Sequence, residues 1–327
     1  MRVFVTGGGG FIGGAVVRLL IGRGDTIVAV VRDPARAADL AVLGATLVSG
    51  DLSTTDGLRT GMTGADAVIH LAGMYRVGMR PRDRPAMLDA NVGATERVLD
   101  AAQAAGVPRI VYVSTVNTFG NTYGRIVDET YDRDVARGFV SYYDETKFRA
   151  HEAADARIAR GAAVVIVQPG TVYGPRDHSA LGMQMEQAFR GRLPYRAVDN
   201  VGVTPIHVDD LAAGIVAALD RGRTGESYVM AGPAMRQAQA LEVAARAGGH
   251  RLPRLRVPSR LLRVLAPLAS RLPAGFAERL GLPPNLAEVL SAAEGVTYWA
   301  TSAKAERELG FRVRDLETGL RDAFGGG

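Results

Sequence analysis

A tyrosine and a lysine stand four residues apart in the segment Tyr143-Asp144-Glu145-Thr146-Lys147. On a helix this spacing puts both side chains on one face, one turn apart. Reduction of a carbonyl needs a hydride at carbon and a proton at oxygen. A free tyrosine titrates at about 10, and a neighbouring ammonium stabilises its phenolate. We therefore predict Tyr143 as a general acid–base and Lys147 as the group that lowers its pKa.

Lys147 is one of only two lysines among the 39 basic residues, the other being Lys304. Of the ten tyrosines, only Tyr143 is followed by a lysine four residues later. A lysine kept against such a preference for arginine indicates a need for a compact ammonium with a tunable pKa, which a guanidinium cannot supply. A surface Tyr–Lys pair on an amphipathic helix is the alternative.

Four consecutive glycines separate the first apolar run from the first amphipathic stretch. Gly7, Gly10 and Gly13 form a GxxGxxG pattern, in which glycine allows positive φ, close approach of the backbone to a pyrophosphate and tight helix–strand contact. A helix that starts here presents amides and positive potential to phosphates. A P-loop is excluded, because Gly14 stands where that motif requires lysine. The pattern predicts a dinucleotide-binding turn.

The first half of the chain alternates short apolar runs with helical patterns. The expected strands are residues 2–6, 26–31, 46–48, 67–71, 109–113 and 163–167. The expected helices are residues 11–22, 34–43, 55–62, 85–105 and 142–160. The strands are almost wholly apolar, which indicates burial on both faces. Their alternation with helices predicts an α/β fold with a doubly wound, Rossmann-type parallel sheet.

Glycine and proline become frequent after residue 167, which indicates a change of organisation. We expect a helix near 180–191 and another strand–helix–strand unit at 203–207, 209–220 and 227–230. We predict a dinucleotide-binding domain of residues 1–167 and 205–230, and a smaller, mainly helical substrate lobe of residues 168–204 and 231–327. The apolar pattern at 260–280 favours a core helix of that lobe, with a substrate wall or a membrane-facing patch as alternatives.

The glycine turn Thr6–Gly13 resembles the TGxxGFxG signature of the extended short-chain dehydrogenase/reductases, the NAD-dependent epimerase/dehydratase family. The resemblance covers nearly the whole chain. The sequence Val31-Arg32-Asp33-Pro34, together with residues 225–228, is most similar to the dihydroflavonol reductase-like group. The resemblance implies an oxidoreductase in which Tyr143 and Lys147 serve the reaction and Lys147 also holds the nicotinamide ribose.

The resemblance also implies a set of cofactor contacts. Around the pyrophosphate and adenine these are Gly7, Gly10, Phe11, Ile12, Gly13, Asp51 and Leu52. Along the ribose and nicotinamide they are Leu71, Ala72, Gly73, Val113, Tyr143, Lys147, Pro169, Gly170, Thr171 and Val172. Asp51 has a helix N-cap as its alternative role, in competition with Ser53. Gln168 replaces the arginine of the family pattern, so the role of that arginine is in doubt.

The third catalytic group is expected in Ser114–Gly120, which resembles the family's SS(S/T)xxxYG segment. Counting back from Gly120 places Thr115 at the position that binds the substrate oxygen, with Ser114 as the alternative. Two further polar residues receive other roles. His70 is expected to be packed and hydrogen-bonded rather than catalytic, and Asn91 to be structural.

The cofactor is expected to be NADP, with NAD as the alternative. Arg32 follows the second strand, where the adenosine ribose lies in this fold, and its guanidinium suits a 2′-phosphate. The carboxylate of Asp33 could instead accept hydrogen bonds from the ribose of NAD. Arg36 either assists Arg32 or is solvated.

The substrate is expected to be a small carbonyl compound or its alcohol. Candidate contacts are Met74, Tyr75, Arg76, Asn117, Phe139 and Met183. Because one triad serves both reactions, a sugar or sugar-nucleotide epimerase or dehydratase is the alternative, with Arg176, Arg190 and Arg192 as candidate phosphate contacts. A non-catalytic NADP-binding sensor is a second alternative, which the Tyr–Lys pair disfavours.

Composition excludes several other classes. The chain has no cysteine, and its five histidines lack ligand spacing, so no metal site is predicted. The net charge is +5, but the arginines are scattered and aromatic residues make up only 6%, which disfavours nucleic acid. With neither a secretory leader nor a long apolar run, we expect a cytoplasmic protein without a membrane span. The sequence does not decide between a monomer and a homodimer.

Overall fold

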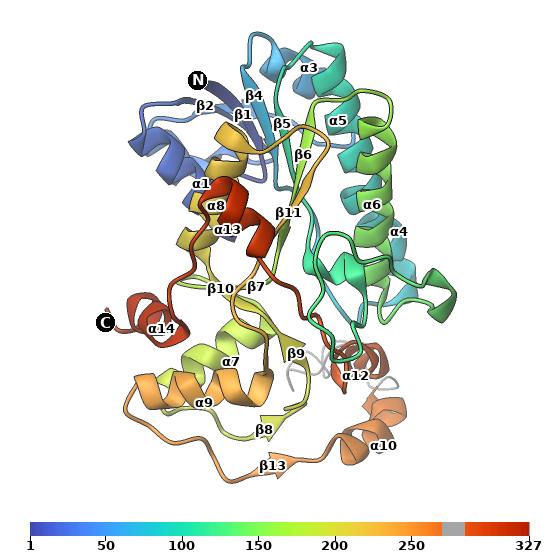
Figure 1. Cartoon of the computed structure of the whole chain (residues 1–327), viewed down its shortest axis with the longest axis vertical. Helices are drawn as coiled ribbons and strands as arrows, with labels where there is room; N and C mark the ends of the chain where they lie inside the picture. Colours follow the sequence, from blue (N-terminus) through green and yellow to red (C-terminus); the bar gives the residue numbers. More distant parts are fainter. Residues whose placement is uncertain (270–284, 327) are drawn as a thin grey trace.

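The computed structural model describes residues 1–269 and 285–326, with a seven-stranded parallel sheet at its centre (Figure 1). The strands are β1 (Arg2–Thr6), β2 (Thr26–Val31), β3 (Thr46–Ser49), β4 (Ala67–His70), β5 (Ile110–Val113), β6 (Val164–Pro169) and β11 (Ser227–Met230). Their order is β11-β6-β5-β4-β1-β2-β3, so the direction of winding reverses between β1 and β4. In such sheets ligands bind at the carboxyl ends of the strands, beside this reversal. The expected doubly wound, Rossmann-type fold is confirmed.

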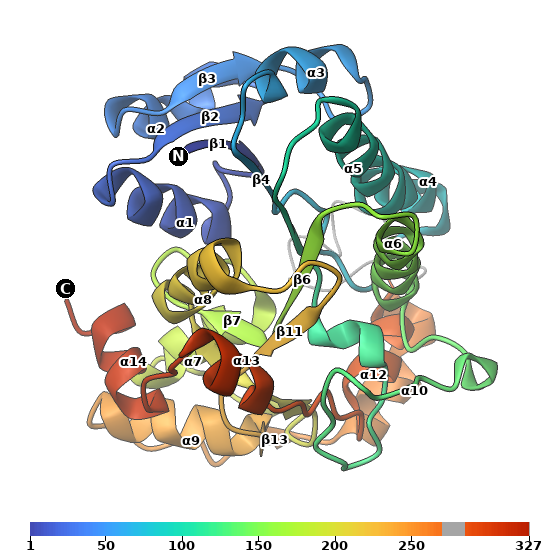
Figure 2. The same ribbon diagram turned by 45° about the horizontal axis from the view of Figure 1, so that its top comes forward.

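Helices cover both faces of the sheet (Figure 2), and alternate residues of each strand face opposite layers. Val3 and Val5 pack with α1 (Phe11–Gly22), α8 (Val208–Arg221) and α13 (Ala303–Leu309). Phe4, between them in sequence, packs with α3 (Asp56–Met62), α5 (Ala94–Ala104) and α6 (Tyr142–Ile158) on the opposite face. Burial on both faces explains why the strands are apolar without alternation.

Two expected helices are interrupted. The stretch expected at 85–105 consists of α4 (Arg84–Leu88), a π-helical turn over Asp89–Gly93, and α5. Within the π turn, the Asn91 side chain bonds both the amide and the carbonyl of Met74, a contact that local periodicity does not encode. The stretch expected at 34–43 begins as a 3-10 turn over Pro34–Ala37 and continues as α2 (Ala38–Val42).

A second group of elements lies below the carboxyl ends of the strands in Figure 1. It contains α7 (Ala180–Phe189), α9 (Gln237–Ala247), α14 (Leu316–Phe324) and three small sheets. The sheets pair β7 (Thr171–Tyr173) with β10 (Pro205–His207), β9 (Gly202–Val203) with β12 (Met235–Arg236), and β8 (Arg196–Ala197) with β13 (Arg256–Val257). The strand expected at 203–207 is thus divided, and neither part joins the central sheet. Ile206 of β10 still packs with α8 in the core cluster under the sheet.

The apolar stretch expected at 260–280 is described only as far as residue 269. It begins in α10 (Ser259–Ala269), where Leu262 packs on Leu286 and Leu290 of α12 (Leu286–Ala293). Leu261 and Val264 are exposed. Residues 270–280, including Leu272 and Phe276, lie outside the described residues. Across 1–269 and 285–326, the structure has no helix of the length and apolarity that crossing a membrane requires.

Candidate active site

The glycine turn packs against the carboxyl end of β4. Gly7 has a φ of +72°, and a Cβ there would lie 2.7 Å from the amide nitrogen of Ala72. A Cβ at Gly13 would collide with the carbonyl oxygen of Gly7. The predicted contacts at Leu71 and Ala72 are therefore brought beside the turn, where Leu71 N donates to Thr6 O at 3.2 Å.

The amino end of α1 is suited to an anion. Gly10 is its N-cap, no side chain caps it, and its first turn carries no acidic residue. The first-turn amides, including those of Phe11 and Ile12, have no partner four residues earlier, and the helix dipole places positive potential there. The tight turn and the free amides fit the pyrophosphate of a dinucleotide.

The ends of β2 and β3 bring the predicted adenosine contacts together. Gly50 N donates to Val31 O at 3.0 Å, which sets Asp51 and Leu52 near Arg32. Arg32 is exposed. The Asp33 carboxylate accepts from Ala35 N at 3.0 Å as the cap of the 3-10 turn.

Asp51 does not cap the following helix. Its Oδ1 accepts from Ser53 N at 3.0 Å in a local turn. The helix α3 begins at Asp56, with Thr55 as an N-cap that makes no side-chain bond, so neither Asp51 nor Ser53 is the cap.

Tyr143 and Lys147 lie in the first turns of α6, and both are buried. The helix starts after Ser141, whose hydroxyl accepts from Asp144 N at 3.1 Å. Lys147 Nζ lies 3.4 Å from Val113 O and 3.5 Å from the Tyr112 hydroxyl, at the carboxyl end of β5. The predicted residues Val113, Tyr143 and Lys147 therefore share one region.

The structure distinguishes the two candidates for the third group. The Thr115 hydroxyl lies near enough to the Tyr143 phenol to act on it, in the direction that lowers its pKa. It also donates to Asn117 Oδ1 at 3.1 Å. The Ser114 hydroxyl is instead bonded to His151 Nδ1 at 2.9 Å. Thr115 is the hydroxyl placed beside Tyr143, and Ser114 is not.

The electrostatics of Tyr143 differ from the sequence-based expectation. Burial is the main cause of a pKa raised well above the ordinary tyrosine value, and the nearby Tyr75 and Tyr112 add to it. The Thr115 hydroxyl opposes this increase without cancelling it. Lys147 does not offset this increase in the structure, because its ammonium is directed at Tyr112 and Val113.

Three predicted substrate contacts lie near Tyr143. The Tyr75 ring meets the Tyr143 ring edge-on with centroids 4.8 Å apart, and it stays 62% exposed. Met74 packs in the apolar cluster that includes Tyr143. Asn117 is held by Thr115.

The other three predicted substrate contacts are not brought to Tyr143. Phe139 packs against the Arg133 guanidinium at 4.5 Å and the Phe148 ring. Arg76 and Met183 are exposed, and no contact joins either side chain to Tyr143 among the residues that the structure describes.

The segment expected to cradle the nicotinamide follows the end of β6. Gly170 N donates to Met230 O at 2.8 Å and Thr171 N donates to Thr204 O at 3.0 Å, which fixes Pro169 to Val172 beside β10 and β11. Gln168 donates to the Thr118 hydroxyl at 3.0 Å and so ties β6 to the Thr115 loop. This contact gives the family-atypical glutamine a structural role.

His70 and Asn91 are held inside the core. Both ring nitrogens of His70 bond hydroxyls, at 2.6 Å to Thr6 and 3.1 Å to Thr95, and burial with the charge of Lys147 lowers its pKa to about 3. Asn91 Nδ2 also donates to the Thr146 hydroxyl at 2.9 Å, which links the loop at Met74 to α6.

Arg133 and Asp144 form a buried ion pair that sequence reasoning missed. Two guanidinium nitrogens bond the two carboxylate oxygens at 2.6 and 2.7 Å, and the Asp144 side chain is fully buried. Arg133 also donates to the carbonyls of Thr118 and Gly138. The sequence signal for this pair was Asp144, a charged residue directly after Tyr143 on the buried side of the helix. Nothing in the sequence indicated that Arg133 is its partner.

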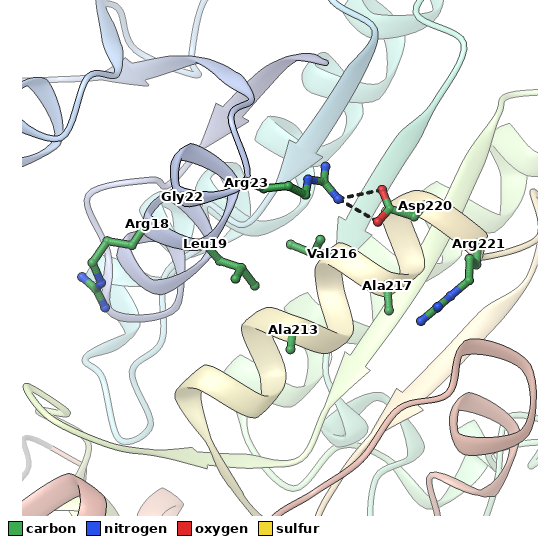
Figure 3. A pocket seen from close by; sticks show the side chains of 9 residues that line it. All are labelled: Arg18, Leu19, Gly22, Arg23, Ala213, Val216, Ala217, Asp220 and Arg221. Atoms are coloured by element: carbon green, nitrogen blue, oxygen red, sulfur yellow. Dashed lines mark hydrogen bonds and ion pairs between the residues drawn. The ribbon is translucent and has the colours of Figure 1, made fainter.

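A hollow of about 580 Å³ lies between the carboxyl-terminal halves of α1 and α8 (Figure 3). Small apolar side chains such as Ala213 and Val216 form its floor. Arg23 donates to both carboxylate oxygens of Asp220 at its edge, at 2.9 and 2.7 Å. No predicted site residue lines this hollow, so it is separate from the candidate active site.

The sheet order and the glycine turn are those of a Rossmann-type dinucleotide-binding fold. The sequence profile of the NAD dependent epimerase/dehydratase family matches residues 3–231. The chain belongs to this family, and the relatives it matches are extended short-chain dehydrogenase/reductases.

Two curated relatives illustrate the range of the family. The chain is 35% identical to a putative dihydroflavonol 4-reductase of Synechocystis sp. over 69% of its own length and 66% of that protein. It is 29% identical to sterol demethylase protein B of Methylococcus capsulatus over 99% of its own length and 96% of that protein.

Solved structures share the whole architecture. The crystal structure of gox2253 has a TM-score of 0.81 at 30% identity, covering 99% of this chain and 97% of that one. The UDP-glucuronic acid 4-epimerase of Bacillus cereus, in complex with UDP-glucuronic acid and NAD, has a TM-score of 0.78 at 19% identity, covering 99% and 98%. The latter likeness supports the fold alone.

We expect Asp144→Asn to lower the free energy of unfolding by about 3 kcal/mol, because it leaves the Arg133 charge buried without its partner. Urea or thermal unfolding measures this change. The matched control is Asp134→Asn, which removes the carboxylate of the exposed Arg137–Asp134 pair and should leave stability unchanged. A double variant Arg133→Met/Asp144→Asn should lose less than the sum of the two single losses. Additive losses would contradict the ion-pair interpretation.

Proposed function

We propose that this chain is an NADPH-dependent reductase of a small-molecule carbonyl compound, with Tyr143 as the proton donor. The observation that carries the proposal is the buried Tyr143 phenol with the Thr115 hydroxyl close enough to act on its pKa, in a fold whose glycine turn suits a dinucleotide. Thr115 and Tyr143 offer two hydroxyls to one substrate oxygen. The bound cofactor would supply the hydride.

The proton chemistry favours reduction. A pKa raised by burial keeps the Tyr143 phenol protonated at neutral pH, so it can give a proton to a developing alkoxide. Thr115 would orient the carbonyl oxygen by turning its O–H from Asn117 Oδ1, to which it donates here, toward the substrate, while Asn117 N still donates to Thr115 Oγ1. Lys147 sits at the end of β5, where it would hold the nicotinamide ribose, with its ammonium kept by Val113 O.

The residues at the ends of β2 and β3 support NADP over NAD. Arg32 is exposed and can donate a charge-assisted hydrogen bond to a 2′-phosphate. Asp33, the group that would favour NAD, is committed to the cap at Ala35 N. The epimerase of Bacillus cereus carries NAD, but its 19% identity does not transfer that choice to this chain.

The alternative, an epimerase acting on a sugar nucleotide, receives less support. Of the candidate phosphate contacts, Arg190 is paired with Glu186 at 2.9 Å. Arg176 is directed toward Asp39 of α2, 4.0 Å away. Each of these two guanidinium groups therefore has a carboxylate neighbour of its own.

Removal of the proton donor tests the mechanism. We expect Tyr143→Phe to lower kcat by roughly 10²–10⁴-fold, because general acid catalysis contributes about that much. NADPH binding, measured by fluorescence titration, should stay unchanged. The assay is NADPH oxidation with a panel of aromatic ketones, aldehydes, flavanonols and sugar nucleotides. Tyr142→Phe is the matched control, since that ring lies against Arg84 instead. Unchanged turnover in Tyr143→Phe would refute the mechanism.

The raised pKa of Tyr143 predicts opposite pH profiles for the two directions. Reduction uses the protonated phenol, so its kcat should be level through neutral pH and fall only in the alkaline range. Oxidation of the product alcohol needs the phenolate, so its kcat should rise with pH through neutrality. Initial rates in both directions across a pH series measure this. An oxidation rate already level at neutral pH would show that the phenol ionises there.

The 2′-phosphate contact is tested at Arg32. Arg32→Ala should weaken NADPH binding roughly tenfold or more, because it removes a charge-assisted hydrogen bond, and should leave NADH binding unaltered. Calorimetric titration with both cofactors measures the two constants. Arg59→Ala, at an exposed arginine of α3, is the control. If NADPH binds Arg32→Ala as tightly as wild type, the argument for NADP fails.

A further inference from the structure

Exposed apolar side chains gather where β8, β13 and α10 lie together, at the lower end of the molecule in Figure 1. The amide of Arg196 donates to Leu255 O at 3.0 Å, which brings the starts of β8 and β13 together. Single exposed apolar side chains are ordinary on a protein surface, but several on neighbouring elements form a patch. They are Tyr195, Leu255, Leu261 and Val264, with exposed fractions of 48%, 63%, 50% and 69%.

The helix α10 has a packed side and an exposed side. Leu262 lies on the packed side, against α12. Val264 stands three residues after Leu261 and four after Arg260, so these three side chains share the other side of the helix. All three are exposed. The exposed side of α10 therefore carries apolar groups next to a positive charge.

The charges of this region have one sign. Residues 243–277 contain no aspartate or glutamate, whereas residues 251–263 contain five arginines. Two of the five are paired with carboxylates of neighbouring elements, at 3.1 Å for Arg256 and 2.6 Å for Arg263. The other three are exposed, and none of them has a carboxylate partner among the residues that the structure describes: Arg251, Arg254 and Arg260.

We propose that this basic apolar surface, made of the four exposed apolar side chains and the three unpaired arginines, docks on an anionic membrane. Leucine and valine side chains enter the boundary between headgroups and acyl chains, while a tyrosine ring favours the interface itself. Guanidinium groups match the phosphates of anionic lipids. A second copy of this chain is a poorer occupant, because a symmetric contact would bring two sets of unpaired arginines together.

The helix α12 joins the basic apolar surface to the candidate active site. Its Glu288 carboxylate accepts from Tyr142 N at 2.7 Å, at the start of α6 and directly before Tyr143. Asn285 N, at its N-cap, donates at 2.9 Å to Gly78 O, in the loop that follows β4. The docked protein would therefore hold the site close to the membrane. Given the proposed reductase function, on which this step rests, its substrate class is an apolar carbonyl compound dissolved in the bilayer.

Vesicle sedimentation measures the docking directly. The full chain should sediment with vesicles of phosphatidylcholine and phosphatidylglycerol in equal parts, much less with phosphatidylcholine alone, and less as the salt concentration rises. Arg254→Gln/Arg260→Gln should lower the partition coefficient on the mixed vesicles about tenfold or more, because each basic residue near the surface contributes about fivefold. The matched control is Arg149→Gln/Arg307→Gln, which removes the same charge from exposed positions of α6 and α13.

The apolar contribution is tested without a change of charge. Because the chain has no cysteine, Val264→Cys accepts a single environment-sensitive dye. Its emission should shift to the blue on the mixed vesicles, whereas the same dye on Val42→Cys, at an exposed valine of α2, should not respond. Leu261→Gln/Val264→Gln should also weaken sedimentation, and circular dichroism checks that this variant is folded.

Three results would overturn the docking proposal. The first is a wild-type chain that stays in the supernatant with the mixed vesicles. The second is an Arg254→Gln/Arg260→Gln variant that binds them as tightly as its control, or a dye at residue 264 that does not respond to them. The third is a dimer, seen by analytical ultracentrifugation without lipid, that dissociates in Leu261→Gln/Val264→Gln, since a second copy would then occupy the surface.

The docking and the reductase function fail separately, because sedimentation and dye emission need neither cofactor nor substrate. For the substrate class, Arg254→Gln/Arg260→Gln should slow NADPH oxidation with a long-chain alkyl ketone carried in the mixed vesicles, and should leave the rate with a short-chain, water-soluble ketone unchanged. A variant as fast as wild type on the vesicle-borne ketone would refute the apolar substrate class. Full activity of Tyr143→Phe with both ketones would instead refute the reductase mechanism.

Discussion

The ion pair between Arg133 and Asp144 holds the first turn of α6, and that turn carries Tyr143. Asp144 directly follows Tyr143, and its carboxylate is fully buried. The guanidinium of Arg133 lies against the rings of Phe139 and Phe148 and also bonds two carbonyls. Charges buried in this way tolerate few alternative arrangements, because any other leaves one of them without a partner. The pair thus anchors the loop before α6 to the helix.

Burial determines the chemistry of the phenol more than its neighbours do. Tyr143 lies among other tyrosines, and the lysine one turn away is held at the end of β5. The protein alone therefore presents a proton donor rather than a base.

Much of the fold was predictable because its signals are local. The bounds of β1, β2 and α1 follow from apolar runs and the glycine turn, and the structure has them at the expected residues. Long-range pairing was not predictable. β10 leaves the central sheet to pair with β7, and the π turn at Asn91 depends on a contact with Met74. The local sequence at β10 and at Asn91 does not indicate β7 or Met74 as their partners.

The candidate site was predictable to the same extent. The motif gave Tyr143 and Lys147, but not the direction in which burial shifts the pKa of the tyrosine, since that depends on tertiary packing. The sequence favoured Thr115 over Ser114 only by its position in the motif, and the contact of the Ser114 hydroxyl with His151 Nδ1 depends on tertiary packing. Arg133 went unnoticed because a scattered arginine is common in this chain and its partner is eleven residues away.

The preference for arginine also leaves the protein with very few amines. Lys147 is buried, and the ammonium of Lys304 is bonded to Glu226 and to Ser227 O, both at 2.7 Å. The amino terminus is paired with Asp25 at 2.8 Å. Reagents that acylate primary amines, whether cross-linkers, fluorescent esters or activated resins, thus have three potential targets, none of them unpartnered. Covalent labelling or immobilisation of this protein is better directed at its carboxylates or at an introduced cysteine.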